Sequence, residues 1–128
     1  RWLGSQSHPA VLDAYRAADS FALPCRVSAD GDRDGLPNVL LEAQSQKLPC
    51  ISTAVSGIPE LIDDGATGLL VAPREPAALA GALSRLIIDP ALRARLGDAG
   101  YLRATGGFSM NAGADHLAAR FLACVPAA

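Results

Sequence analysis

Cysteine is scarce in this chain, and its placement excludes two classes of small protein. The 128 residues include three cysteines, Cys25, Cys50 and Cys124, and no C-x-x-C pair. Disulfide-stapled secreted domains and zinc knuckles need more cysteines at closer spacing. We therefore expect reduced thiols and no structural metal.

Long apolar runs and a cationic surplus are also missing. No apolar stretch approaches the roughly 20 residues that a membrane-spanning helix needs, and residues 1–10 lack the pattern of a signal peptide. With 13 acidic and 11 basic side chains, the formal charge is −2. The chain thus lacks the basic surface that neutralises a nucleic-acid backbone. These absences predict a soluble, cytoplasmic protein that does not bind nucleic acid.

Familiar nucleotide-binding and catalytic signatures are absent as well. The sequence has no G-x-G-x-x-G fingerprint, no phosphate-loop lysine and no nucleophile-elbow serine. Its single lysine, Lys47, is interpreted as a charge at the end of a predicted helix. His8 and His116 have no partner at metal-ligand spacing.

What is present is an alternation of short apolar runs and helical patterns. Apolar runs predict buried strands at 20–24, 49–53 and 69–71, with the end of another strand at 1–4. Helical spacing predicts helices from about 8 to 18 and over 38–46, 76–88, 90–104 and 110–125, with a single turn at 57–62. This order predicts the α/β class, a parallel sheet covered by helices and followed by a helical tail.

Apolar spacing in the tail predicts two helix faces that pack on the core. The helix at 76–88 is expected to use Leu79, Leu83, Leu86 and Ile87, and the helix at 90–104 to use Leu92, Leu96 and Leu102.

The most informative segment is D-G-D-R-D-G-L-P-N-V-L-L-E-A, residues 30–43, which leaves the strand at 20–24 and enters the helix at 38–46. In open parallel sheets, ligands bind beyond the carboxyl ends of the strands. Pro37 is expected as the first helical residue. The backbone N–H groups at this helix start lack intrahelical partners and favour an anion; they belong to Gly35, Leu36, Asn38 and Val39. A phosphate group fits this position.

Two carboxylates flank the helix start. Asp34 and Glu42 are eight residues apart, and the rise from Pro37 to Glu42 is roughly 8 Å. That is about the span of a diphosphate with a sugar at one end and a ribose at the other. Carboxylates accept paired hydroxyl donors. The alternative is that Asp34 caps the helix and Glu42 is a solvated mid-helix residue.

The run D-G-L-P-N-V-L-L-E-A, followed by L-P-C-I-S-T-A-V-S-G-I-P-E-L-I-D-D-G-A-T-G-L-L-V-A-P, resembles a known family. It is similar to the second half of the nucleotide-sugar-binding domain of retaining glycosyltransferases with the GT-B fold, in glycosyltransferase family 4. The resemblance covers nearly the whole chain. It implies that Asp34 contacts hydroxyls of the donor sugar and that Glu42 holds the ribose. Gly35, Leu36, Asn38 and Val39 would meet the sugar or diphosphate through their backbone.

The sequence departs from the family pattern at the first acid. Asp34 stands where Glu is more usual, a difference of one methylene that bears on reach and sugar preference. Near the motif, the cationic residues are Arg26 and Arg33. The basic residues that the family places upstream to neutralise the diphosphate lie outside this chain.

The resemblance implies a domain organisation and a function. Residues 1–128 are expected to be a partial donor-binding, C-terminal domain, the second half of a Rossmann-like sheet, without the N-terminal acceptor domain. The donor would be a nucleotide diphosphate-sugar used without a bound metal, and the acceptor a sugar or lipid-linked glycan. Membrane-surface association would come only through missing parts, and the isolated chain is expected to be inactive.

Two alternatives stay open. One is a non-catalytic binding or scaffold module of the same fold, against which the intact pair Asp34 and Glu42 counts. The other is an unrelated Rossmann-like nucleotide or effector domain, against which the missing glycine fingerprint counts.

The implied strand order makes a further prediction about assembly. It places the strand at 20–24 in the middle of a larger sheet, with one neighbour outside this chain. That strand would be an unpaired apolar edge here, and such edges pair with other chains. The chain is therefore expected either to self-associate along this edge or to be an ordered part of a longer polypeptide whose upstream part completes the sheet.

Overall fold

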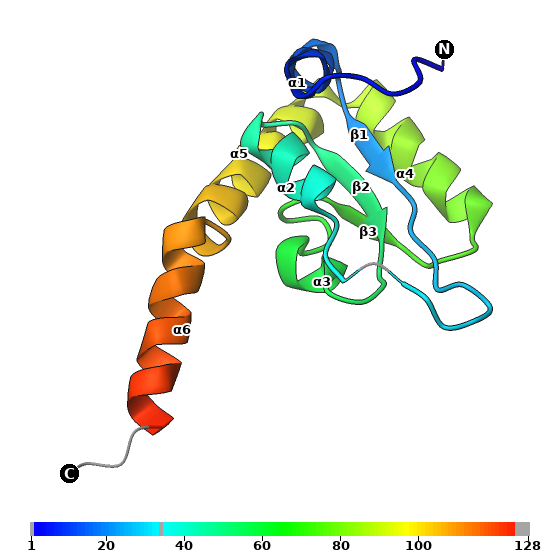
Figure 1. Ribbon diagram of the computed structural model, residues 1–128. Helices are drawn as coiled ribbons and strands as arrows, with labels where there is room; N and C mark the ends of the chain where they lie inside the picture. Colours follow the sequence, from blue (N-terminus) through cyan, green and yellow to red (C-terminus); the bar gives the residue numbers. More distant parts are fainter. Residues whose placement is uncertain (1, 34, 125–128) are drawn as a thin grey trace.

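The chain folds as alternating helices and strands, followed by three consecutive helices (Figure 1). The computed structural model describes residues 2–33 and 35–124. In chain order, its elements are α1 (His8–Ala17), β1 (Phe21–Leu23), α2 (Asn38–Ser45), β2 (Cys50–Thr53), α3 (Ile58–Leu61), β3 (Leu69–Val71), α4 (Pro76–Ile88), α5 (Pro90–Gly107) and α6 (Met110–Cys124). This confirms the α/β class and the predicted order from the first helix onward.

The strands form one parallel sheet in the order β1-β2-β3. Phe21 is opposite Cys50, and Ile51 is opposite Leu69. The central strand β2 is buried at every position. Parallel strands covered on both faces carry apolar residues without alternation, which is the pattern from which these strands were predicted.

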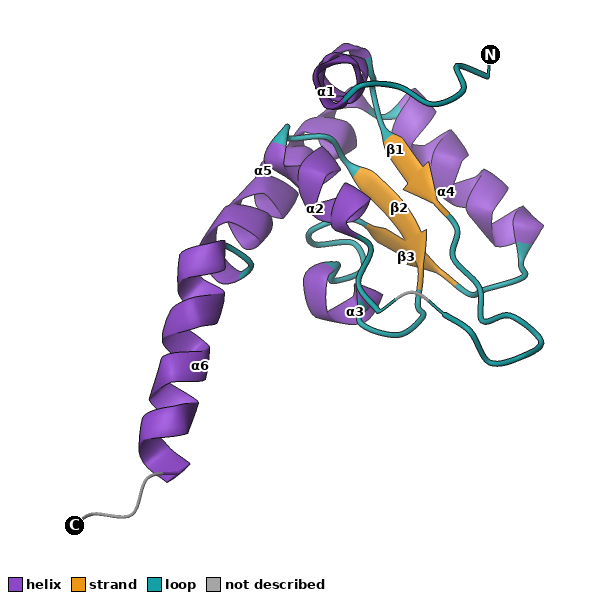
Figure 2. Cartoon of the chain, in the orientation of Figure 1, coloured by secondary structure: helices purple, strands orange, loops and turns teal. Residues whose placement is uncertain are grey.

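Side chains alternate between two cores, one on each face of the sheet. Phe21 and Cys50 pack with α1, α2 and α3 on one face, while Ile51 and Leu69 pack with α4 and the start of α5 on the other. This follows because successive strand residues point to opposite faces. Figure 2 shows the sheet between α2 and α4.

The helical tail differs from its prediction in two side chains. Leu102 is 69% exposed and Ile87 is 72% exposed, so neither belongs to the core. The inner face of α5 is built instead from Leu96, Gly97, Gly100 and Ala104. Leu102 lies six positions after Leu96, roughly 240° around the helix, and therefore faces solvent. Ile87 follows the buried Leu86 and is turned away by roughly 100°.

Helix α5 runs longer than predicted, and α6 lies apart from the body of the fold. α5 continues past residue 104 to Gly107, and α6 projects away from the sheet (Figure 1). No described residue of α6 is buried.

The predicted strand end at the start of the chain is wrong for its described part. Residues 2–4 form no ladder with the sheet, and the Trp2 side chain is 94% exposed. A strand needs a hydrogen-bonded neighbour, and these residues have none among the described part of the chain. Arg1 lies outside the described residues.

Candidate functional site

The loop that carries the predicted site is anchored at the carboxyl end of the sheet. Residues 24–37 leave β1 at the edge where all three parallel strands end. From β2, the Ser52 hydroxyl donates to the Leu23 carbonyl and the Thr53 hydroxyl donates to the Cys25 carbonyl, both at 2.7 Å. The start of the loop is therefore held in place by side chains of the central strand.

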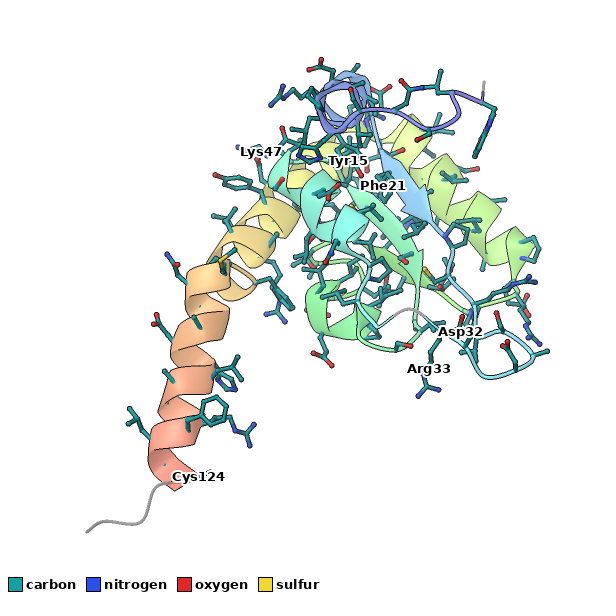
Figure 3. The ribbon with its side chains drawn as sticks, viewed as in Figure 1. Tyr15, Phe21, Asp32, Arg33, Lys47 and Cys124 are labelled. Atoms are coloured by element: carbon teal, nitrogen blue, oxygen red, sulfur yellow. The ribbon has the colours of Figure 1, made fainter. Side chains whose placement is uncertain are left out.

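The outer part of the loop is a closed turn. The Ser28 N–H donates to the Asp32 carbonyl at 2.8 Å, and the Asp32 N–H donates to the Asp30 carboxylate at 3.1 Å. Gly31 has a φ of +85°, which glycine adopts without strain. Figure 3 shows Asp32 and Arg33 on this exposed turn, with the Arg33 side chain directed away from the sheet.

Helix α2 begins at Asn38, where the predicted range 38–46 begins, and Pro37 is not the first helical residue that it was expected to be. Pro37 has φ −63° and ψ 122°, so it precedes the helix, and Asn38 is the first helical residue. The extended ψ keeps Pro37 out of the helix, although its φ is already in the helical range. The Pro37 carbonyl accepts from the Leu40 N–H at 3.1 Å, and its ring offers no capping group. Pro37 therefore leaves the N–H groups of Asn38 and Val39 available to an outside acceptor.

The other residues predicted from the sequence gather at this helix start. Gly35 is exposed, and its carbonyl accepts from the Gly57 N–H at 2.9 Å. Leu36 packs against the core on the α2 face. Asn38 is exposed and Val39 is half-buried. Asp34 lies outside the described residues.

Glu42 lies one turn into α2 and is held by a residue from another helix. It follows Asn38 by four positions, which places both on the same helix face. Its Oε2 accepts a hydrogen bond from the Tyr15 hydroxyl of α1 at 3.3 Å. Tyr15 is itself buried, and its ring lies edge-on to that of Phe21 with 5.5 Å between the ring centroids (Figure 3). Half-buried and hydrogen-bonded, Glu42 differs from a freely solvated mid-helix residue.

The Tyr15 phenol is kept in its donor form. Burial, followed by the negative charge of Glu42 and the hydrogen bond to it, raises the pKa of Tyr15 above its ordinary value. At neutral pH the phenol is therefore protonated and donates to the carboxylate. Tyr15 was not among the site residues predicted from the sequence, because 27 residues separate it from Glu42 and no local pattern links the two.

This arrangement can recognise two chemical groups at once. The exposed N–H groups at the start of α2 and the helix macrodipole suit a phosphate. Glu42, one turn further on, presents acceptor oxygens that suit a pair of hydroxyl groups. Residues 2–33 and 35–124 hold no group of three His, Cys, Asp or Glu side chains that could bind a metal ion. None of the described helices is long and apolar enough to cross a membrane.

Similarity to known proteins extends over most of the chain. The family model for glycosyl transferases group 1 matches residues 1–103. D-inositol 3-phosphate glycosyltransferase of Actinosynnema mirum is 41% identical over 96 residues, which cover 75% of this chain and 22% of that protein. The chain thus spans about a fifth of the length of this curated relative.

Solved structures share the fold. The C-terminal domain of a glycosyl transferase group 1 protein, LpcC of Francisella tularensis, is 28% identical with a TM-score of 0.66, over 86% of this chain and 52% of that one. The Anabaena protein HepE, solved with UDP and glucose, is 21% identical with a TM-score of 0.78, over 98% of this chain and 32% of that one. The expected fold, an α/β domain with the second half of a Rossmann-like parallel sheet of the GT-B type and a helical tail, is confirmed. With most of its length matched by the family model, this chain belongs to the glycosyl transferases group 1 family.

Proposed function

We propose that this chain carries the donor-binding surface of a retaining glycosyltransferase that moves a sugar from a nucleotide diphosphate to an acceptor. The observation that carries the proposal is the start of α2, where N–H groups left uncapped by Pro37 lie one turn from a carboxylate held by Tyr15. HepE, which has this fold, was solved with UDP and glucose, and that supports the same class of ligand here.

The donor would lie along the start of α2. The diphosphate accepts hydrogen bonds from backbone N–H groups of Gly35, Leu36, Asn38 and Val39. Glu42 accepts from the ribose hydroxyls. Asp34, on the family resemblance, accepts from hydroxyls of the donor sugar. Glu42 would then bind the nucleotide part of the donor and Asp34 the sugar part.

The rest of the protein's function is proposed on the resemblance. Residues 1–128 act as part of a C-terminal donor domain, and the acceptor, a sugar or lipid-linked glycan in polysaccharide biosynthesis, binds an N-terminal domain. The reaction takes place in the cytoplasm, a proposal supported by the scarcity of cysteine, with three in 128 residues and no C-x-x-C pair. The chain alone is inactive because the diphosphate needs further positive charge to depart.

The experiment is an amide NMR titration of the chain with UDP-glucose, GDP-mannose and UDP, with NAD as a non-donor control. We expect shifts at residues 35–39. Glu42→Ala should weaken nucleotide and nucleotide-sugar alike by at least about tenfold, since hydrogen bonds to a charged group contribute about 1.5–3 kcal/mol. Asp34→Ala should weaken only the nucleotide-sugar. Asp115→Ala, an exposed acid on α6, is the matched control.

Two outcomes would contradict the proposal. Absence of shifts at residues 35–39 with every nucleotide at millimolar concentration would show that α2 is not the donor surface. Equal weakening of UDP by Asp34→Ala and Glu42→Ala would show that the division of roles between the acids is wrong.

Donor binding without a metal is tested separately. We expect the UDP-glucose affinity to be the same in EDTA as in magnesium, because the negative charge of the diphosphate is stabilised by backbone N–H groups rather than by a cation. A several-fold loss of affinity in EDTA would contradict this part of the proposal.

A further inference from the structure

A cavity of about 270 Å³ opens at the carboxyl end of the sheet, on the face covered by α4. Each strand contributes to it: Pro24 follows β1, Thr53 ends β2 and Val71 ends β3. None of Gly35, Leu36, Asn38, Val39 and Glu42 lines it. The cavity is therefore distinct from the proposed donor surface, which lies at the start of α2 on the other side of the sheet.

The inner wall of the cavity is largely apolar. Val71 and Leu79 belong to the core on the α4 face, and Pro24 adds a third apolar surface. The Thr53 hydroxyl is already engaged with the Cys25 carbonyl. This wall suits the carbon body of a ligand better than a charged group.

The rim of the cavity is cationic. Arg26 and Arg74 both line it. Neither arginine takes part in an ion pair within the described part of the chain. Arg74 donates from Nη2 to the Val27 carbonyl at 3.3 Å, which positions its guanidinium and leaves its other N–H groups for a ligand. Glu75 is a single acid beside the two cations, so this part of the rim has a surplus of one positive charge.

The start of α4 adds to the positive potential. Pro76 begins this helix of 13 residues and lines the cavity, and its preceding residue Glu75 provides no side-chain cap. The positive end of the helix macrodipole thus faces the same space as the two guanidinium groups. These features coincide at a cavity with an apolar wall.

We propose that this cavity binds a small organic anion, a phosphate or carboxylate on a compact carbon body. The oxygens of such a group match the planar donors of Arg26 and Arg74, and the body rests on Val71 and Leu79. Pockets for drug-sized ligands span about 300–1,000 Å³, so a cavity of about 270 Å³ admits a compact molecule and not a whole nucleotide-sugar.

The test is an amide NMR titration of the chain with phenyl phosphate, benzoate and neutral phenol at constant ionic strength. We expect phenyl phosphate or benzoate to shift amides of the non-proline residues within 72–79, with phenol binding at least about tenfold more weakly. Comparing the two anions identifies the preferred group. Arg26→Gln and Arg74→Gln should each weaken the preferred anion by about tenfold. Arg85→Gln, at an exposed arginine of α4 outside the cavity, should leave the affinity unchanged.

Further arms separate this site from the donor surface and from folding effects. Saturation with UDP-glucose, or the Glu42→Ala substitution, should not displace the anion. Because Arg74 also holds the Val27 carbonyl, Arg26→Gln decides the result if Arg74→Gln alters the amide spectrum as a whole. Competition with UDP-glucose, shifts confined to residues 35–39, or equal affinities of Arg26→Gln and Arg85→Gln would each overturn the inference.

Discussion

At the scale of single residues, the site depends on one contact between side chains distant in sequence. Tyr15 is buried against Phe21 and reaches Glu42 with its hydroxyl. The aromatic contact fixes the ring and the hydroxyl fixes the carboxylate. A residue that looks like ordinary core in the sequence thereby acts as a positioning residue for the proposed ligand group.

Tyr15→Phe should separate these two roles. The ring contact with Phe21 is retained while the hydrogen bond to Glu42 is lost, so we expect little change in stability and UDP binding weaker by roughly three- to tenfold. NMR titration measures the affinity. In a double-mutant cycle, Tyr15→Phe should have no further effect once Glu42 is alanine. An equal effect with and without Glu42 would show that Tyr15 acts on binding by another route.

The buried thiol of Cys50 should make the free energy of unfolding depend on pH. Burial raises the pKa of the Cys50 thiol to about 12 from an ordinary value of 9.0. Between these values the unfolded chain releases this proton and the folded chain keeps it, so the unfolded state binds fewer protons. The free energy of unfolding should therefore fall as pH rises above 9, by up to about 1.4 kcal/mol per pH unit from this group.

The measurement is urea unfolding at several pH values between 8.5 and 10.5 for the natural chain and for Cys50→Ala. The substitution should flatten the pH dependence in addition to lowering stability overall. Lys47 titrates in both proteins, and its contribution cancels in the comparison. The pKa of Tyr15 stays raised in both by burial and by Glu42, and only its smallest cause, the charge of Cys50, is lost in the variant. If the two proteins lost stability with pH in parallel, the Cys50 thiol would not be the cause of the pH dependence.

At the scale of elements, α5 is positioned by glycines. A Cβ atom at Gly97 would overlap the Lys47 carbonyl, and one at Gly100 would lie 3.0 Å from the Thr67 carbonyl. Gln44, at 0% exposure, also donates to that Thr67 carbonyl at 3.0 Å. These close approaches bring α5 against the end of α2, and so support the helix whose first turn forms the candidate site.

Gly97→Ala should be strongly destabilising. The opposing atom is backbone, so the helix or the turn at Lys47 must shift, and we expect a loss of about 2–4 kcal/mol in the free energy of unfolding. Gly81→Ala is the matched control, because that helical glycine has open space around it. The control should raise stability by about 0.5–1 kcal/mol. Similar effects of the two substitutions would show that α5 is not held this closely.

At the scale of the whole molecule, β1 forms one of the two edges of the described sheet. Phe21 donates its N–H to the Pro49 carbonyl beside β2, which turns the peptide groups of Ala22 toward the opposite edge. Ile87, at 72% exposure, lines a hollow with Asp19 and Ser20, just before this strand. An unpaired strand beside an apolar surface favours pairing with another chain.

We predict that the chain self-associates through β1, and that Ala22→Lys shifts it to a monomer in sedimentation equilibrium, because an edge lysine opposes strand pairing. The exposed apolar side chains of α6 offer a competing surface, which Phe121→Glu tests. Dissociation by Phe121→Glu alone would place the contact on α6. A monodisperse monomer of the natural chain at high concentration, with protected amides in residues 20–24, would contradict the edge contact and the strand order on which it rests.

Local chemistry determined the elements of this protein. Apolar runs without alternation marked the three strands because parallel strands are buried on both faces. Pro37 and the motif through Glu42 located the helix start to within one residue, because proline restricts φ wherever it stands. Family membership also rests on the sequence, since ordered motifs at fixed spacing are specific to a family.

Tertiary structure alone decided which side chains meet. The contact between Tyr15 and Glu42, the approach of Gly97 to Lys47, and the meeting of Arg26 with Arg74 around one cavity join positions far apart in the chain. The exposure of Leu102 was decided in the same way, because the face that α5 buries depends on which neighbour it packs against. Periodicity in the sequence describes one helix or strand at a time. These contacts depend instead on how two elements are oriented when they pack on the same sheet.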